Sequence, residues 1–182
     1  DVSEVLERLR QANLILKPSK CQFFQRQVRY LGHIVSESGL SADPEKLAAV
    51  AEWQRPQTVT ELRQFLGFAS YYRKFILGFS QISQPLFRLL KKDEAFLWSS
   101  EQEDSFQLLK ECLVSSPILV HPDFRESSGE FVVDTDASIQ GLGAVLSQKQ
   151  PDGTEKVIAY ASRTLNQYER SYCATRSELL AI

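Results

Sequence analysis

The sequence lacks the residues that mark several common classes of protein. Its 182 residues include no methionine, two histidines and three cysteines, Cys21, Cys112 and Cys173, which form no Cys-x-x-Cys pair. Isolated cysteines in odd number indicate reduced thiols rather than a disulfide framework, and two histidines leave too few ligands for a structural zinc site. No apolar run approaches the ~20 residues that cross a membrane, and no secretory signal pattern is present. We therefore expect a globular protein of a reducing compartment, without a membrane partner.

The two ends of the chain predict that it is part of a longer protein. The first residues already follow a helical pattern, with Val2, Val5, Leu6 and Leu9 at spacings of three and four. At Ile182 the sequence stops where an apolar helix face has only begun.

The net charge of −2 hides an uneven distribution. Residues 1–93 contain 14 lysines and arginines against 9 acidic residues, a net charge of +5, and residues 94–182 contain 7 against 14, a net charge of −7. A basic part suggests contact with phosphate groups, and an acidic part suggests metal binding. Scattered, solvated charges explain the same numbers equally well.

The hydrophobic periodicity changes along the chain, from a helical period to a period of two after Pro117. The expected helices are 2–14, 44–53 behind an Asp43 cap, 59–76 behind a Thr58–Glu61 capping box, one that starts at Ser83–Pro85 and runs to residue 92, one behind a Ser100–Glu103 box, and one behind a Thr175–Glu178 box. The expected strands are 27–36 with a turn at 37–40, then 129–136, 142–149 and 156–163. This order predicts an α+β fold with a domain boundary between residues 93 and 120.

The expected helix at 59–76 has an unusual second face. One face is the ordinary apolar core stripe of Leu62, Phe65, Leu66, Ala69, Tyr72 and Ile76. The opposite face carries Arg63, Gln64, Gly67, Tyr71 and Lys74. An exposed mid-helix glycine costs roughly 1 kcal/mol relative to alanine. The face makes sense if a nucleic acid lies against it, since glycine permits close approach and the cations meet phosphates. Packing of Gly67 against a neighbouring helix is the alternative.

A second feature is the acidic strand around Asp134 and Asp136. Residues i and i+2 of a strand point to one face, so the two carboxylates are expected to be neighbours. An EF-hand would require glycine and a bidentate acid where Ile139 and Val145 stand, and a retropepsin-type aspartic protease would require glycine where Asp136 stands. Both are excluded. A hard-metal site for phosphodiester chemistry remains, and it requires another acid, for which Glu178 is the candidate. Glu178 is also explained as the capping-box residue.

Several motifs resemble the polymerase polyproteins of gypsy-type LTR retrotransposons. The run from Glu61 to Ile76, Glu-Leu-Arg-Gln-Phe-Leu-Gly-Phe-Ala-Ser-Tyr-Tyr-Arg-Lys-Phe-Ile, resembles the thumb of their reverse transcriptases. Lys20–Phe24 and Tyr30–Ser36 match the same family in the same order, and the second of these resembles the primer-grip hairpin. The likeness covers essentially the whole chain. It implies that the thumb helix follows a duplex minor groove. The residues it assigns to nucleic-acid binding are Tyr30, Leu31, Gly32, His33, Arg63, Gln64, Gly67, Tyr71 and Lys74.

The later part resembles the first half of the ribonuclease H domain of the same family. The run Asp-Ala-Ser-x-x-Gly-x-Gly-Ala-Val-Leu at 136–146 resembles its first strands, and residues 172–181 resemble the start of its first helix. The likeness implies that Asp136 and Glu178 are catalytic, metal-binding carboxylates. They would be two of four acids that hold two Mg²⁺ ions for hydrolysis of the RNA strand of an RNA–DNA hybrid. Asp134 is expected to stand outside the metal ligands.

The resemblance also predicts an organisation and a function. The expected parts are the end of the palm and the primer-grip hairpin (1–40), the helical thumb (41–93), a connection helix and linker (94–128), and an incomplete ribonuclease H-like mixed sheet whose first three strands are antiparallel, with flanking helices (129–182). The whole protein is expected to copy RNA into DNA and to degrade the RNA of hybrids, in the cytoplasm within a virus-like particle or in the nucleus. Its partners would be the primer–template duplex, the RNA–DNA hybrid and the rest of the polyprotein.

The fragment itself is expected to be inactive. The polymerase acids of the family would precede residue 1, and the last two ribonuclease H acids would follow Ile182. Two functional alternatives remain: a non-catalytic nucleic-acid-binding or scaffold protein derived from such an element, and an unrelated helical interaction domain fused to a β-domain.

Overall fold

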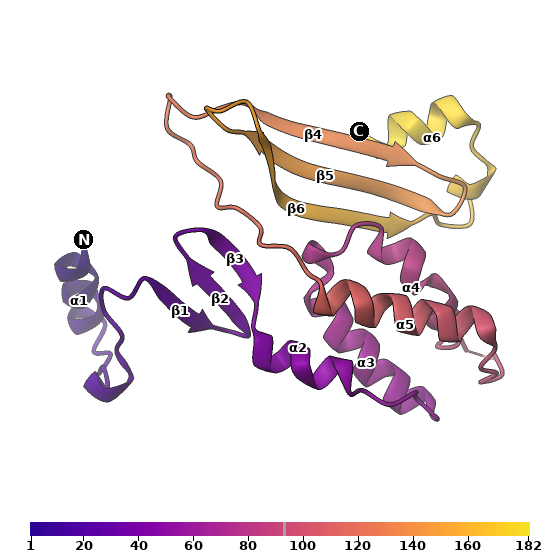
Figure 1. The fold of residues 1–182 in the computed structure, drawn as a ribbon, viewed down its shortest axis with the longest axis horizontal. Helices are drawn as coiled ribbons and strands as arrows, with labels where there is room; N and C mark the ends of the chain where they lie inside the picture. Colours follow the sequence, from indigo (N-terminus) through magenta and orange to yellow (C-terminus); the bar gives the residue numbers. More distant parts are fainter. Residues whose placement is uncertain (93) are drawn as a thin grey trace.

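Two three-stranded antiparallel sheets flank a group of helices in the computed structural model, which describes residues 1–92 and 94–182 (Figure 1). The helices are α1 Val2–Gln11, α2 Pro44–Ala51, α3 Val59–Tyr71, α4 Phe79–Arg88, α5 Ser100–Val114 and α6 Ala174–Ala181, with 3-10 turns η1 Pro18–Lys20, η2 Arg73–Phe75 and η3 Glu169–Ser171. The strands are β1 Gln27–Tyr30, β2 His33–Ser36, β3 Gly39–Ala42, β4 Phe131–Ala137, β5 Gly141–Lys149 and β6 Glu155–Thr164. The predicted α+β class is confirmed, including three antiparallel strands in the second sheet.

The small sheet differs from its prediction. The single strand expected at 27–36 is two strands, β1 and β2, separated by a tight turn at Leu31 and Gly32. Both turn residues have positive φ, 48° and 74°, as the two-residue hairpin turn that fits strand twist requires. The usual sequence signal of such a turn is Asn-Gly, Asp-Gly or Gly-Gly. Here leucine precedes Gly32, so the turn was not predicted. The turn predicted at 37–40 is present and joins β2 to β3, with Gly39 at φ 134° where β3 begins.

Several predicted helix boundaries were wrong, including the end of α1, which lies at Gln11 rather than at residue 14. The helix expected at 59–76 stops at Tyr71 and continues as the 3-10 turn η2. Helix α4 begins at Phe79, because Gly78 in the left-handed region starts a new helix before Pro85, which lies inside it. Helix α5 is capped by a Ser99–Gln102 box, one residue before the expected pair. The cap of α3 was correct, since the Thr58 hydroxyl accepts a hydrogen bond from the Glu61 N–H at 3.2 Å.

One hydrophobic core lies among α2–α5 and η2. The predicted stripe of α3 and η2 is buried, and it meets α5 where the rings of Phe65 and Phe106 lie 4.6 Å apart. The second sheet rests on this group through β6, which packs on α4, while α6 packs against β4 (Figure 1). In the described residues, Leu142 and Leu165 are the only buried hydrophobic residues outside that core.

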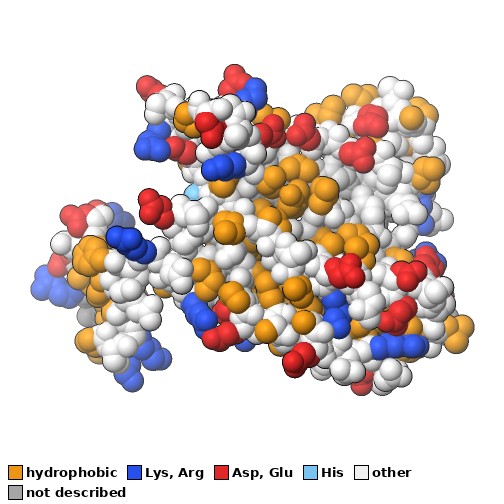
Figure 2. Space-filling view, viewed as in Figure 1, with side chains coloured by type: hydrophobic (Ala, Val, Ile, Leu, Met, Phe, Trp, Pro, Cys, Tyr) orange, Lys and Arg blue, Asp and Glu red, His pale blue; other side chains and the backbone are white. Residues whose placement is uncertain are grey.

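Figure 2 shows charged side chains of both signs around α1, whose residues are all at least partly exposed, and hydrophobic side chains gathered over the middle of this face. No helix in the described part of the chain is long and apolar enough to span a bilayer. The predicted domain limits stay predictions, and the limit at residue 93 lies outside the described residues.

Candidate nucleic-acid interface and metal site

The exposed side of α3 carries the residues that the sequence predicted there. Arg63, Gln64, Gly67 and Tyr71, which we call the α3 ridge, are all exposed, and the Tyr71 side chain is 49% exposed. A Cβ atom built on Gly67 would find nothing within 4 Å. A neighbouring helix therefore does not explain the glycine. Since alanine would favour the helix, the open space above Gly67 points to something outside the described residues.

Lys74 lies beside the ridge rather than on it. It belongs to η2, is half-buried, and its Nζ lies 5.3 Å from the centre of the Phe75 ring. Burial lowers the pKa of the Lys74 ammonium. The sequence predicted Lys74 on the same face as Arg63 because it assumed one continuous helix to residue 76, whereas α3 ends at Tyr71.

The β1–β2 turn is attached to the end of α3. The Tyr72 hydroxyl donates a hydrogen bond to the Gly32 carbonyl at 2.8 Å, and the Tyr71 hydroxyl donates to the Leu31 carbonyl. A Cβ atom on Gly32 would lie 2.8 Å from the Tyr72 hydroxyl oxygen, so this approach requires glycine. The structure thus brings together two segments that the sequence predicted separately. Sequence reasoning missed this role of Tyr72, since a tyrosine on the apolar stripe looks like an ordinary core residue.

His33 occupies a different place from the one predicted. Its side chain is 9% exposed and lies behind the turn, stacked on Phe75 with ring centres 5.7 Å apart. Its Nδ1 lies 3.0 Å from the Leu31 carbonyl, which can only accept, so Nδ1 carries the proton. The Nε2 atom is buried without a partner among the described residues. Burial, and secondarily the charge of Lys74, lowers the His33 pKa. His33 therefore supports the turn from behind, and its predicted contact with nucleic acid stays a prediction.

The remaining turn residues face outward. Tyr30 is 64% exposed and Leu31 is 69% exposed, and the Leu31 carbonyl accepts the hydrogen bond from the Tyr71 hydroxyl. A single exposed apolar side chain is common on a protein surface. Two of them beside the α3 ridge form an exposed apolar group, which is more typical of a binding surface. The α3 ridge and residues 30–32 therefore form one surface of aromatic, small and cationic residues.

The two predicted metal ligands lie on elements that pack together. Asp136 is exposed near the end of β4, opposite Gly143 of β5. Glu178 is exposed on α6, which packs against β4. Asp134 is also exposed, two residues before Asp136. The capping explanation of Glu178 is wrong, because α6 begins earlier, with Cys173 as its N-cap, and no side chain caps it.

These carboxylates match a Mg²⁺ site in type but not in number. Oxygen ligands suit this ion, which commonly binds through one or two carboxylates and retained waters. Across residues 1–92 and 94–182, however, no group of three or more histidine, cysteine and acidic side chains is arranged to hold a metal. The chain therefore presents two carboxylates that could contribute to a site, and not a complete set.

Comparison with known proteins agrees with this architecture. Residues 98–182 match the family described as an RNase H-like domain found in reverse transcriptase. The Tf2-3 and Tf2-4 transposon polyproteins of Schizosaccharomyces pombe are each 41% identical over 181 residues, an alignment that covers 100% of this chain and 13% of each relative. The chain thus spans a small part of the curated relatives that it matches.

Solved structures show the same fold. The foamy viral protease-reverse transcriptase in complex with dsDNA matches with a TM-score of 0.78 and 24% identity, over 98% of this chain and 37% of that one. Its complex with an RNA/DNA hybrid matches with a TM-score of 0.75 and 24% identity, over 100% of this chain and 25% of that one. These solved structures show the fold, and the sequence relatives confirm the predicted resemblance to retrotransposon polyproteins. Residues 98–182 are the part that matches the RNase H-like domain found in reverse transcriptase.

Proposed function

We propose that the chain is the part of a reverse transcriptase/ribonuclease H polyprotein that grips a primer–template duplex or RNA–DNA hybrid, through the α3 ridge and residues 30–32. The observation that carries the proposal is the open space above Gly67 on an exposed helix face that also presents Arg63 and Tyr71. The structural neighbours described as complexes with dsDNA and with RNA/DNA hybrid support it.

The chemistry of the surface suits a nucleic-acid backbone. Arg63 supplies a cation for phosphate, Gly67 lets the sugar–phosphate chain approach the helix closely, and the half-exposed Tyr71 ring offers an apolar face. The two tyrosine hydroxyls hold the turn of residues 31 and 32 against α3. A strand of the duplex would therefore meet a surface whose two parts are already fixed relative to each other.

The same proposal includes a nuclease role for the second sheet within the longer polyprotein. Asp136 and Glu178 would hold Mg²⁺ together with acids from outside these 182 residues. Bound there, the metal would activate a water molecule and stabilise the leaving oxygen. The contribution of this chain is to fix one carboxylate on a strand and another on the helix packed against it.

The test of the duplex surface is the substitution Gly67→Ala. The added methyl group has space in the free protein and favours the helix, so we expect the free energy of unfolding to rise by about 0.5–1 kcal/mol. We expect the affinity for an RNA–DNA hybrid to fall, because the methyl group blocks close approach. A control is Ser3→Ala at an exposed position of helix α1, outside the ridge, which should leave the hybrid affinity unchanged. Unchanged hybrid affinity for the stabilised Gly67→Ala protein would contradict the proposal.

The non-catalytic alternative has its own measurement. We expect the 182-residue chain alone to bind hybrid without cleaving it, and a longer polyprotein that contains it to cleave the RNA strand in Mg²⁺. Binding without cleavage by the longer polyprotein as well would favour a nucleic-acid-binding or scaffold protein. Turnover by the isolated chain that Asp136→Asn abolishes would contradict the inactivity that we expect of it.

A further inference from the structure

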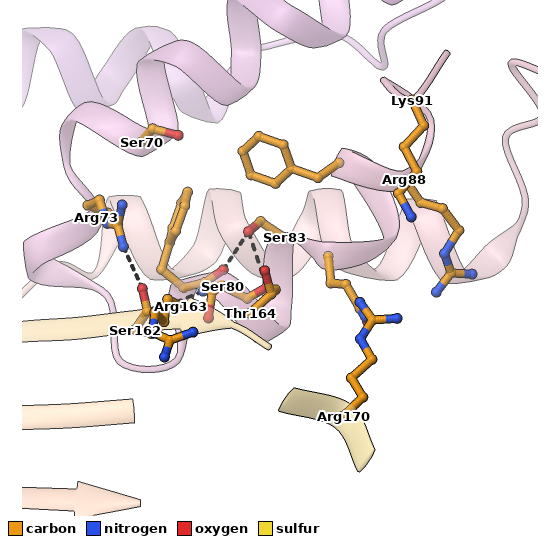
Figure 3. Close-up of a pocket in the computed structure, with 13 residues that line it drawn as sticks. Ser70, Arg73, Ser80, Ser83, Arg88, Lys91, Ser162, Arg163, Thr164 and Arg170 are labelled. Carbon is orange, nitrogen blue, oxygen red and sulfur yellow. Dashed lines mark hydrogen bonds between the residues drawn. The ribbon is translucent and has the colours of Figure 1, made fainter. Parts of the chain in front are cut away.

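A cationic cavity lies between α4 and the end of β6, away from the surfaces discussed above. Its volume is about 640 Å³, which is within the range of small-molecule sites. Five basic side chains line it, Arg73, Arg88, Lys91, Arg163 and Arg170, together with five hydroxyl side chains and two phenylalanines. No aspartate or glutamate of the described residues is among the lining side chains. Figure 3 shows Arg73 at one end and Arg88, Lys91 and Arg170 at the other.

The positive charge of the cavity is only partly compensated. Arg163 is neutralised by Glu169 in a bidentate pair at 2.7 and 3.0 Å. Arg88 has a looser partner, Glu101, at 3.4 Å. Arg73 donates to the Ser162 carbonyl, which is neutral. Like charges gathered in a partly enclosed space repel each other unless an anion joins them.

Arg170 is the second cation with a neutral partner. Its Nε donates to the Leu165 carbonyl at 3.3 Å, and the structure gives it no carboxylate partner in the parts of the chain that it describes. The guanidinium nitrogens beyond Nε keep their donors for another group. Arginine is well suited to planar, bidentate recognition of phosphate.

The wall of the cavity is held in place before any ligand enters. The Ser162 hydroxyl of β6 accepts a hydrogen bond from the Ser80 N–H of α4 at 2.9 Å, so strand and helix are joined directly. The Ser83 hydroxyl is fixed on the Phe79 carbonyl at 2.6 Å. Beside these groups, Phe87 is 41% exposed and offers an aromatic face. Cations, hydroxyls and an aromatic ring around a space of this size match the chemistry of a nucleotide.

We infer that this cavity binds a phosphate-bearing ligand of nucleotide size, with the phosphate between Arg88 and Arg170 and the base beside Phe87. The ligand is either a free nucleotide or one nucleotide unit of a single strand, since both present the same phosphate. The inference does not depend on the duplex surface, because no residue of the α3 ridge lines the cavity.

Isothermal titration of the 182-residue chain tests the site with three probes: pyrophosphate, AMP and an oligothymidylate of about ten residues, at about 0.1 M salt. The double variant Arg88→Gln/Arg170→Gln should weaken binding by about 10-fold or more, because two charge-assisted contacts to phosphate are lost. The control Arg8→Gln/Arg10→Gln removes the same charge from the exposed α1 and should leave binding within about 2-fold. Gln84→Trp keeps the charge and fills the cavity, so it should also weaken binding.

The outcomes separate the sources of the phosphate. Binding of pyrophosphate and AMP with this pattern of variants identifies a free nucleotide as the ligand. Binding of the oligonucleotide alone, with the same pattern, identifies a unit of a single strand. If no probe binds at millimolar concentration, or if the α1 control loses as much affinity as the cavity variants, the inference is wrong and the cavity is a gap in packing. Circular dichroism of each variant establishes that it is folded.

Discussion

The helical part of the molecule and its second sheet are built differently. Among α2–α5 and η2, large side chains such as Phe65, Leu109 and Leu113 are completely or almost completely buried in one cluster. In β4–β6, hydrophobic residues as large as Phe131 and Val133 remain 42% and 62% exposed. Since buried apolar area is the main stabilising term, the helices should provide most of the stability of this chain.

The functional groups are divided between the same two parts. The ridge that we propose for nucleic acid lies on the well-packed helices. The carboxylates that we propose for Mg²⁺ lie on strand β4 of the sparsely covered sheet and on helix α6, which packs against it. A rigid grip favours precise positioning of a duplex. The sheet, by contrast, holds its two acids on strand and helix surfaces that are open to solvent. The two proposed roles, duplex binding and metal-dependent cleavage, therefore fall on regions that differ in how much apolar surface they bury.

The largest expected effect concerns the sheet. In a longer polyprotein that contains these residues, Asp136→Asn should lower cleavage of the hybrid RNA by more than the roughly 10–100-fold typical of groups outside the ligand shell. The matched control is Asp134→Asn, two residues earlier on the same strand, which should change the rate little. RNA cleavage in Mg²⁺ measures both. Equal losses of cleavage for the two variants would contradict the assignment of Asp136, and not Asp134, as a metal ligand.

The next effect is on stability and compares the two regions directly. Phe65→Ala should lower the free energy of unfolding by about 3–5 kcal/mol, because it opens a cavity in the core. Val133→Ala, at an exposed position of β4, should change it by no more than about 0.5 kcal/mol. Urea denaturation followed by circular dichroism measures both values. A large loss at Val133 would show that the sheet is packed more tightly than the burial indicates.

A smaller effect is expected where the hairpin turn meets the helices. Tyr72→Phe removes the hydrogen bond to the Gly32 carbonyl inside a buried contact and should cost about 1–2 kcal/mol of unfolding free energy. Tyr71→Phe makes the same chemical change at a half-exposed position, where water replaces the lost partner, and should cost less. The same denaturation measurement compares them, and a reversed order would contradict the proposed attachment of the turn.

The smallest effect concerns pH. Burial lowers the pKa of His33 below the ordinary value near 6.5, so below that pH the unfolded chain binds more protons than the folded one. The stabilisation from the neutral imidazole is complete above about pH 6.5 and is lost as the pH falls towards the lowered folded pKa. The unfolding midpoint in urea should therefore drop between pH 7.5 and 5.5. His33→Gln should reduce this drop, whereas the control His121→Gln, at an exposed histidine, should not.

The parts that the sequence predicted correctly depend on short-range patterns. The core stripe of α3, its Thr58 cap and the three antiparallel strands each follow from periodicity or capping within a few residues. The exposure of Arg63, Gly67 and Tyr71 follows from the same helical period.

The parts that it missed depend on contacts between distant segments. Leu31 adopts positive φ in a turn that hydrogen-bonds to Tyr71 and Tyr72, 40 residues later. The burial of His33 and the cavity between α4 and β6 also arise only when segments far apart in sequence meet. Glu178 looked like a capping residue because the Thr175–Glu178 spacing fits, although the helix begins before it.

The central claim is that the α3 ridge touches nucleic acid, and the salt dependence of hybrid binding by Arg63→Gln tests it most directly. Losing one phosphate contact should reduce the slope of log K against log salt by about 0.7–0.9, while Arg125→Gln, at an exposed arginine paired with Asp123, should leave the slope unchanged. An Arg63→Gln slope equal to that of the unsubstituted chain would show that hybrid binds elsewhere.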